Sequence, residues 1–205
     1  MELFPKFFYD IIIFREVVMN ICVFCGSNFG KNENFEKVAR ELGREIALRG
    51  DRLVYGGGKR GLMGVVARSA LDSGGEVIGV MPHILIEKEL ALDGLTEFIK
   101  VKDMSERKLS MIEKSDAFVL LPGGIGSLEE FFDVYSASQL STHTSPIVIF
   151  NIDSYYDPVT EMINNVVEEG FAPEIDKNLF IVVEDASEMY EKMLDFKHVV
   201  GVKHK

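Results

Sequence analysis

Short apolar runs alternate along this chain with longer segments in which apolar residues recur every three or four positions. The short runs are rich in Val, Ile and Leu and predict buried strands over residues 21–25, 53–55, 77–81, 117–121, 147–150 and 180–183, with a further strand or an irregular crossover over 96–101. The longer segments predict helices over residues 35–48, 62–71, 103–113, 128–139, 156–169 and 186–194. Apolar strands that are each followed by a helix predict an α/β fold: a doubly wound, Rossmann-like parallel sheet with helices on both faces.

The amino-terminal segment does not follow this alternation. Residues 1–18 contain an apolar run, 7–14, that Asp10 interrupts. The run is too short to span a bilayer, and no small-residue cleavage site of a signal peptide follows it. We interpret residues 1–18 as an extension outside the fold or, alternatively, as a packing arm or partner-binding strand. Residues 19–205 are expected to form a single domain.

Charge and cysteine content argue against several classes of protein. The chain has 33 acidic and 22 basic residues, a net charge of −11, which argues against a nucleic-acid polymer as partner. Cys22 and Cys25 cannot form a disulfide scaffold, and their place in a predicted strand favours core packing over a redox pair. The four histidines are scattered, so no metal site is expected. We expect a cytoplasmic protein with no membrane partner.

Three of the predicted strand ends are rich in glycine: residues 26–27, 56–58 and 123–126. In parallel sheets, ligands bind beyond the carboxyl ends of the strands. The strongest signal is PGGIGSLEE, in which glycines let the backbone approach a ligand closely. Ser127 is placed to cap the following helix, whose free N–H groups attract a phosphate. The spacing matches neither the Walker A loop nor G-x-G-x-x-G, and a tight turn without a ligand is the alternative.

Three pairs of charged residues lie near these strand ends: Lys59 and Arg60, Arg107 and Lys108, and Glu129 and Glu130. Either glutamate can simply be stabilised by the helix dipole, or it can reach a ligand's reacting bond. Spacing does not show which of the two glutamates has which role. The middle pair opposes the dipole at the start of the predicted helix 103–113, which indicates an anionic partner: a ligand or a neighbouring glutamate. The first pair is either solvated or faces a phosphate. The methionines and phenylalanines follow helix and strand faces and are predicted to be core.

Together these segments resemble the LONELY GUY (LOG) family, whose mark, Pro-Gly-Gly-x-Gly-Thr-x-x-Glu, stands here as PGGIGSLEE. Four further segments are similar to family segments in the family's order: ICVFCGSNFGKN, LVYGGGKRGLMG, VIGVMP and DMSERK. The resemblance covers about residues 20–194. Some relatives have carried the label lysine decarboxylase, but a pyridoxal enzyme needs a Schiff-base lysine with supporting groups, which cannot be placed here.

The resemblance implies a phosphoribohydrolase, often a homodimer, that cleaves the N-glycosidic bond of a cytokinin riboside 5′-monophosphate or of AMP. The products are the free base and ribose 5-phosphate. It implies a nucleotide-binding catalytic domain over residues 19–205 that needs no cofactor and no metal. By resemblance, Arg107 and Glu130 are catalytic. The implied substrate-binding positions are Glu89, Lys108, Gly123, Gly124, Ile125, Gly126, Ser127, Leu128, Glu129 and Ser136.

Departures from the family pattern leave the preferred base open. Ser127 replaces the usual Thr and keeps the hydroxyl, Ile125 stands where plant-type members carry Tyr, and Ser105 where many carry His. Two other functions were weighed. A non-catalytic carrier of a nucleotide or pterin cofactor needs the glycine loop but not the Arg107 and Glu130 pair. A dinucleotide-dependent oxidoreductase needs a fingerprint spacing that this chain lacks.

Overall fold

The computed structural model describes residues 17–88 and 90–201. These residues form β1 (Asn20–Phe24), α1 (Glu33–Leu48), β2 (Arg52–Tyr55), α2 (Gly61–Asp72), β3 (Glu76–Pro82), α3 (His83–Ile86), β4 (Glu97–Val101), α4 (Met104–Glu113), β5 (Ala117–Leu120), α5 (Ile125–Gln139), β6 (Ile147–Phe150), η2 (Ile152–Ser154), α6 (Asp157–Glu168), η3 (Glu174–Asn178), β7 (Ile181–Val183) and α7 (Ala186–Asp195). All the predicted strands and helices are present, and β4 is a strand rather than an irregular crossover. The short helix α3 and the 3₁₀ turns η2 and η3 were not predicted.

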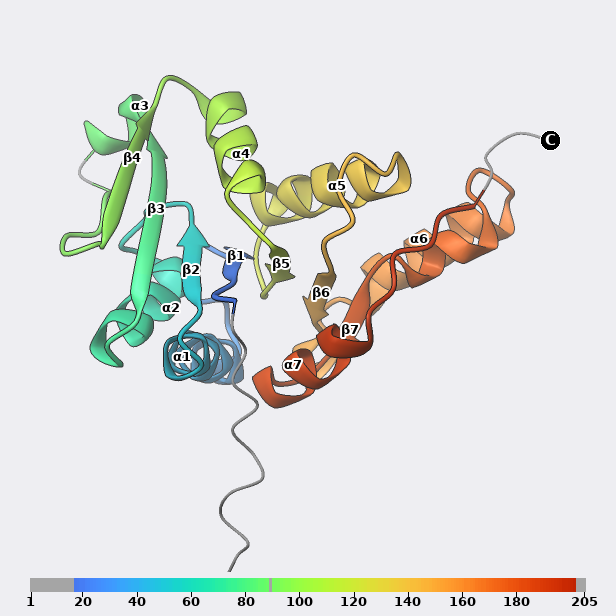
Figure 1. Cartoon of the computed structure of the whole chain (residues 1–205), viewed down its shortest axis with the longest axis horizontal. Coiled ribbons are helices and arrows are strands. Elements are labelled where there is room, and N and C mark those ends of the chain that lie inside the picture. Colours follow the sequence, from blue (N-terminus) through green and yellow to red (C-terminus); the bar gives the residue numbers. More distant parts are fainter. Residues whose placement is uncertain (1–16, 89, 202–205) are drawn as a thin grey trace, which may run out of the picture.

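The described strands form one parallel sheet of seven strands in the order β4-β3-β2-β1-β5-β6-β7 (Figure 1). The chain builds outward from β1 to β4 and then returns to place β5 beside β1, where Phe24 pairs with Leu120. The strand order therefore reverses between β1 and β5. In sheets of this type a ligand crevice opens at that point. This is the predicted doubly wound, Rossmann-like fold.

Helices cover both faces of the sheet (Figure 1). On one face, Leu42 and Ile46 of α1 and Val66 of α2 are fully buried in a cluster that also includes residues of α7. On the other, Met111 of α4 and Phe131 of α5 are buried with residues of α6. Burying a side chain of this size contributes about 1.5–3 kcal/mol. The two apolar layers fix the sheet and leave its strand ends to form a site.

The start of α1 follows from its sequence. The side chain of Asn32 accepts a hydrogen bond of 3.0 Å from the Asn34 N–H and so caps the helix. Inside the helix, Gly43 allows close packing on α2, because a Cβ there would collide with the Val66 carbonyl oxygen. The helix end is followed by Gly50 at φ 73°, a left-handed conformation that glycine adopts without strain. The predicted stop at this glycine is confirmed.

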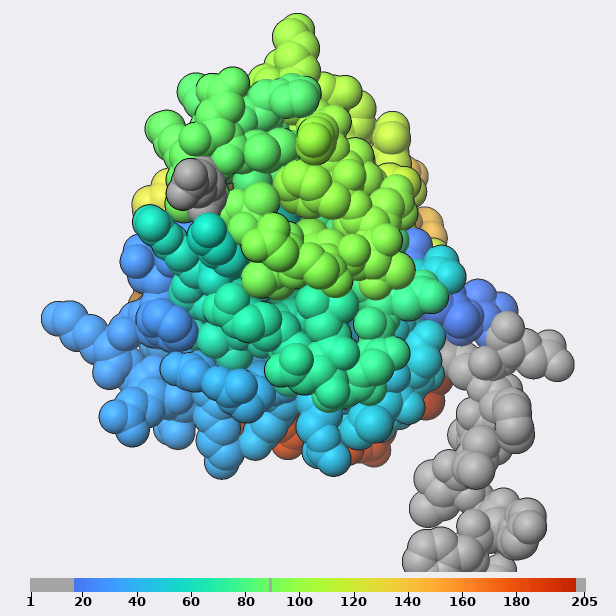
Figure 2. Space-filling model, turned by 90° about the vertical axis from the view of Figure 1, so that its left-hand side faces the viewer, coloured from blue at the N-terminus to red at the C-terminus, as the bar shows by residue number. Residues whose placement is uncertain are grey.

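The segment from α3 to β4 closes one edge of the sheet. Figure 2 faces this edge and shows the segment in green, above α1 in blue. Backbone hydrogen bonds attach the segment to the loop after β2: Lys59 N to Leu90 O at 2.9 Å, and Leu92 N to Gly57 O at 3.0 Å. The backbone around Leu90 and Leu92 therefore lies beside the loop after β2.

The predicted extension, residues 1–18, lies outside the described residues except for Val17 and Val18, whose side chains are exposed. Over residues 17–88 and 90–201, no helix is both long enough and apolar enough to cross a membrane. Sheet pairing begins at Asn20, which is opposite Arg52 of β2.

Candidate active site

A cavity of about 410 Å³ lies at the carboxyl ends of the strands, beside the point where the strand order reverses. Its walls come from the loops after β1, β2 and β5, from α4, and from the first turns of α5. The glycines that line it come from all three of the glycine-rich strand ends: Gly26, Gly56, Gly58, Gly124 and Gly126. The segments that the sequence singled out for ligand binding therefore converge on one cavity.

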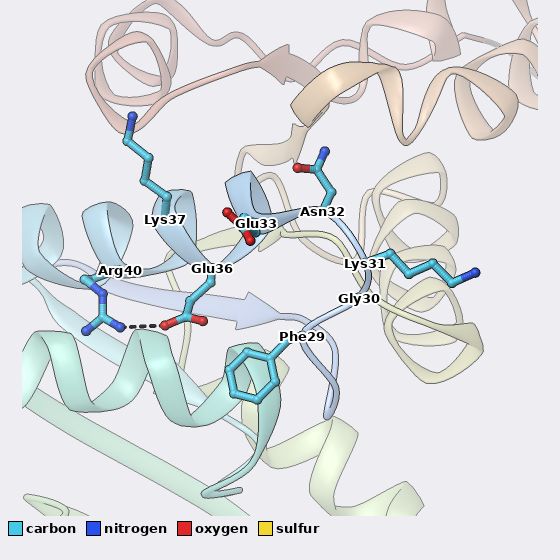
Figure 3. Close-up of a pocket in the computed structure, with 8 residues that line it drawn as sticks. All are labelled: Phe29, Gly30, Lys31, Asn32, Glu33, Glu36, Lys37 and Arg40. Carbon is cyan, nitrogen blue, oxygen red and sulfur yellow. Dashed lines mark hydrogen bonds and ion pairs between the residues drawn. The ribbon is translucent and has the colours of Figure 1, made fainter.

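Two further hollows lie near the start of α1. One, of about 510 Å³, adjoins the first cavity across the loops after β1 and β5. The other, of about 470 Å³, is open to solvent over the first turns of α1 (Figure 3). In it Glu36 and Arg40 form an exposed ion pair of 2.7 Å, and Lys31 and Lys37 extend away from each other. Exposed ion pairs of this kind contribute little to stability, and the two lysines do not point toward this pair (Figure 3). We therefore place the chemistry in the first cavity.

A buried ion pair forms part of the wall of the first cavity. Arg107 Nη1 lies 3.2 Å from Glu130 Oε1, and the two side chains are only 10% and 9% exposed. The Arg107 Nε–H donates to the Val80 carbonyl oxygen at 3.2 Å, which fixes the guanidinium against β3. A Cβ at Gly56 would collide with this guanidinium, so the glycine after β2 makes room for the arginine. Sequence spacing did not predict that these two residues meet.

Glu130 retains the capacity to bind a further group. Its Oε1 atom is buried, and no aligned hydrogen bond from the described residues reaches it. Burial raises the pKa of the Glu130 carboxyl above its ordinary value of 4.5; the Arg107 guanidinium opposes this rise, and Glu129 adds to it. A buried carboxylate with a raised pKa is a stronger base than an exposed one. Glu130 is therefore suited to accept a proton from, or to orient, a water molecule in the cavity.

Glu129 lies in a different environment from Glu130. Its carboxylate is 58% exposed and lies 2.8 Å from Lys108 Nζ, which also lies 2.8 Å from Asp133. These hydrogen bonds lower the pKa of Glu129 and raise that of Lys108. Adjacent carboxyl groups whose pKa values are shifted in opposite directions are suited to different roles. The anionic partner of Lys108 in this structure is thus a pair of surface carboxylates at the rim of the cavity.

The start of α5 differs from the prediction. The helix begins at Ile125 with Gly124 as N-cap, and no side chain caps it. Ser127 was predicted to be the cap, and this is wrong: it lies in the first turn, is buried, and follows two residues that are already helical. The reason is that Gly124 takes up the extended conformation of an N-cap, φ −98°, itself. Gly124, Ile125, Gly126 and Ser127 therefore border the cavity together, and the free N–H groups at the start of a helix favour an anion.

The structure brings most of the predicted site residues together. Those that line the cavity are Arg107, Lys108, Gly124, Ile125, Gly126, Ser127, Glu129 and Glu130. Gly123 lines the adjoining hollow, and Leu128 packs against the core beneath α5. Ser136 is exposed on α5 and is not part of the cavity lining. Glu89 lies outside the described residues.

The apolar wall of the cavity was not predicted. It is formed by Met63, Met81, Leu85, Leu90 and Met104. The prediction that the methionines are core residues is incomplete for Met63, Met81 and Met104, which also line the cavity. Their positions carried a signal: Met81 lies near the carboxyl end of β3, and Met104 is the first residue of α4, both at the ligand end of the sheet. By contrast, Lys59 and Arg60 do not line the cavity.

The two cysteines are free thiols and are buried, as predicted for core residues. Cys25 also borders the cavity, but burial raises its pKa, so the thiol stays protonated and is not a nucleophile. Over residues 17–88 and 90–201 no group of three or more His, Cys, Asp or Glu side chains is placed to hold a metal ion.

Fold and cavity together define a class of protein: a Rossmann-like α/β protein in which the start of a helix lies beside a buried carboxylate–guanidinium pair. The family model described as "Possible lysine decarboxylase" matches residues 63–193. The chain is 43% identical to the probable cytokinin riboside 5′-monophosphate phosphoribohydrolase LOGL9 of Oryza sativa subsp. japonica, over 86% of this chain and 78% of the relative. It is 40% identical to the cytokinin riboside 5′-monophosphate phosphoribohydrolase LOG5 of Arabidopsis thaliana, over 87% and 78%. The chain belongs to the LOG family, and the predicted resemblance is confirmed.

A solved structure confirms the fold independently. The molybdenum cofactor binding protein of Rippkaea orientalis superposes with a TM-score of 0.69, over 87% of this chain and 97% of that protein. The two sequences are 20% identical. At that level the likeness establishes the shared fold, and the sequence relatives establish the family.

Proposed function

We propose that this protein hydrolyses the N-glycosidic bond of a nucleoside 5′-monophosphate and releases the free base and ribose 5-phosphate. One observation carries the proposal: the buried Arg107–Glu130 pair lies in the same cavity as the anion-binding start of α5. A phosphate site supplies binding energy remote from the reacting bond, and a buried carboxylate supplies a base. The curated relatives bear the name of this activity.

The phosphate acts as the anchor of the substrate. Its oxygens accept hydrogen bonds from the N–H groups at the start of α5 and from the Ser127 hydroxyl, where the helix dipole also favours negative charge. Energy gained there holds the ribose in a fixed position and lowers the entropy cost of the reaction. The bond to the base is then placed beside Glu130, five residues beyond the first residue of the helix.

Bond cleavage passes through a ribosyl oxocarbenium ion. A water oxygen bonds to C1′ as the bond from C1′ to the base nitrogen breaks, and the bonding electrons leave with the base. Glu130 accepts the water proton, and the departing base takes up a proton in turn. The carboxylate also stabilises the positive charge that develops on the ribose. Arg107 orients the carboxylate, and its positive charge opposes the pKa rise that burial causes and so favours the ionised, basic form of Glu130.

The apolar wall is the part of the cavity that faces the base. Met63, Met81 and Met104 provide flexible, polarisable surface for a purine ring and for an apolar substituent on it. We therefore propose both cytokinin riboside 5′-monophosphates and AMP as substrates, which makes the protein an AMP nucleosidase as well.

The proposal extends to a homodimer acting in the cytoplasm, with residues 19–205 as its catalytic domain. Exposed apolar side chains on α4 and at the start of α5 support the dimer: Met104 is 42%, Leu109 56% and Ile125 82% exposed. The buried free thiols suit a reducing compartment. Sedimentation would show a single species of twice the chain mass, and a monomer at micromolar concentration would contradict the dimer.

A product assay tests the proposed activity. The protein is incubated with AMP, isopentenyladenosine monophosphate and adenosine, and the free bases are separated by chromatography. We expect base release from both monophosphates and much slower release from adenosine, because adenosine lacks the anchor. Binding of AMP without release of adenine or isopentenyladenine from either monophosphate would contradict the enzyme and favour a nucleotide carrier.

A further inference from the structure

The loop between β5 and α5 is held by hydrogen bonds to three consecutive carbonyl oxygens. Leu121 O accepts from the Tyr156 hydroxyl at 2.9 Å, Pro122 O from the Gly26 N–H at 3.1 Å, and Gly123 O from the Tyr155 hydroxyl at 2.6 Å. The donors come from two separate segments, the loop after β1 and the turn after β6. Every peptide plane between Leu121 and Gly124 is therefore fixed from outside the loop.

The Tyr155 hydrogen bond fixes an N–H group that borders the candidate active site. In a trans peptide, the C=O of one residue and the N–H of the next point in opposite directions. The carbonyl of Gly123 points to Tyr155, so the N–H of Gly124 points away from that tyrosine. Gly124 is the N-cap of α5 and lines the cavity of Arg107 and Glu130. The tyrosine hydroxyl thus determines the direction of one donor at the anion-binding end of the helix.

The turn that carries Tyr155 is strained and is held in place by side chains. Asp153 and Ser154 both have left-handed backbone, at φ 50° and φ 61°, and such a conformation costs a residue other than glycine about 1–2 kcal/mol. The Asp153 carboxylate accepts hydrogen bonds from Asn32 Nδ2 at 2.6 Å and Asn34 Nδ2 at 2.8 Å, both at the start of α1. A strained turn persists only where its surroundings over-determine it.

Packing alone does not explain the hydroxyl group of Tyr155. Its ring lies edge-on to Phe35 at 5.2 Å and to Tyr156 at 4.7 Å between centroids, contacts that a phenylalanine would keep. Tyr156 is 1% exposed and belongs to the core, whereas Tyr155 is 42% exposed. A half-exposed phenol gains little stability from a hydrogen bond, because water competes for the same acceptor.

We propose that Tyr155 is a positioning residue for the phosphate site: its hydroxyl orients the Gly123–Gly124 peptide so that the Gly124 N–H faces the 5′-phosphate. The proposal rests on the phosphate site of the proposed function but not on catalysis. It predicts that Tyr155 acts on ligands through their phosphate and not through the base or the ribose. Asn34 supports the same effect at a distance, through Asp153 and the turn.

The test compares phosphate-bearing and phosphate-free ligands on Tyr155→Phe. Calorimetry measures the dissociation constants of ribose 5-phosphate and AMP, with adenosine as the phosphate-free ligand. Loss of one hydrogen bond that orients a donor to a charged group is expected to raise the dissociation constants of ribose 5-phosphate and AMP by about fivefold to tenfold. Adenosine binding stays within twofold. In steady-state assays the KM for AMP rises by the same factor while kcat changes less than twofold.

Tyr135→Phe is the matched control, since it removes a tyrosine hydroxyl that donates to another main-chain carbonyl, Asp176 O, at 3.2 Å. It leaves the affinity for both phosphates unchanged. A second variant, Asn34→Ala, weakens phosphate binding in the wild-type background but adds nothing to Tyr155→Phe, because both act through one hydrogen bond.

The proposal is overturned if Tyr155→Phe weakens the binding of adenosine and of AMP equally. It is also overturned if the variant binds ribose 5-phosphate and AMP as tightly as the wild type does. A wild-type protein that binds neither ribose 5-phosphate nor AMP overturns it as well. A wild-type protein that binds ribose 5-phosphate but does not cleave AMP contradicts the proposed hydrolysis alone. In that case the dissociation constants still decide whether Tyr155 positions the loop.

Discussion

Replacing Arg107 by alanine leaves the Glu130 carboxyl in the cavity without its partner. The two side chains are 10% and 9% exposed, so water replaces little of the lost interaction. Removing one member of a buried ion pair lowers the free energy of unfolding by about 3–5 kcal/mol when the remaining charge stays buried and unpaired. Here the carboxyl can instead take up a proton, and the free energy of that protonation sets the size of the stability loss. Protonation costs about 1.36 kcal/mol for each unit by which the pH exceeds the pKa of the carboxyl, so it costs more at pH 7 than at pH 5.

The sign of the pH dependence follows from the direction of the shift. Burial already raises the pKa of Glu130 in the folded protein, and loss of the Arg107 guanidinium raises it further. A raised carboxyl pKa means that the folded state binds more protons than the unfolded state above pH 4.5. Stability therefore falls as pH rises from there to the folded pKa. The stability deficit of Arg107→Ala should therefore be smaller at pH 5 than at pH 7, by at most about 2.7 kcal/mol, which is the free energy of one proton over two pH units.

Urea unfolding at pH 5 and pH 7 measures this difference directly. The control is the double variant Arg107→Ala with Glu130→Gln, which has no titrating group in the pair. Measured against Glu130→Gln, which also lacks the titrating carboxyl, its stability deficit should be the same at both pH values. An Arg107→Ala protein that loses the same stability relative to wild type at pH 5 and pH 7 would show that Glu130 is not a buried carboxyl held by the arginine.

Three further predictions follow from the cavity. Gly56→Ala forces the Arg107 guanidinium to move. It should therefore lower the free energy of unfolding by about 1–3 kcal/mol and also lower the kcat for AMP. A variant with the wild-type kcat would contradict the contact. Ser127→Ala should raise the KM for AMP about tenfold. It should change the free energy of unfolding by less than about 0.5 kcal/mol, because Ser127 is not the helix cap. A stability loss near ~1 kcal/mol would instead identify Ser127 as the cap. The kcat for AMP should rise with pH through an apparent pKa above 4.5, because the ionised form of Glu130 is the base; a rate that falls over that range would exclude this role.

The fold could be predicted from the sequence because the strands over residues 21–25, 53–55, 77–81, 117–121, 147–150 and 180–183 are apolar runs, and the helices carry apolar residues every three or four positions. The start of α5 could not be placed, because a glycine in extended conformation and a serine are both good N-caps. Gly124 takes that position and leaves Ser127 in the first turn. Sequence patterns record which residue types suit a helix start, but the path of the preceding loop decides which of them caps it.

The site could be located more easily than its roles could be assigned. The glycine-rich strand ends indicated the cavity, but Glu129 and Glu130 were equivalent by spacing. What separates them is burial: Glu130 meets Arg107 inside the cavity, while Glu129 meets Lys108 at the rim. Tyr155 gave no signal at all, because its hydroxyl contacts a residue 32 positions away along the chain. Such contacts depend on tertiary structure, not on any local pattern.

We propose Glu130 as the base in the cleavage of a nucleoside 5′-monophosphate. A single-turnover experiment with excess enzyme and AMP tests this role, with release of adenine followed for wild type, Glu130→Gln and Glu129→Gln. We predict equimolar adenine and ribose 5-phosphate from wild type, binding of AMP without release by Glu130→Gln, and release within about tenfold of the wild-type rate by Glu129→Gln, whose carboxylate is 58% exposed. Release of adenine by Glu130→Gln at the wild-type rate would contradict the claim.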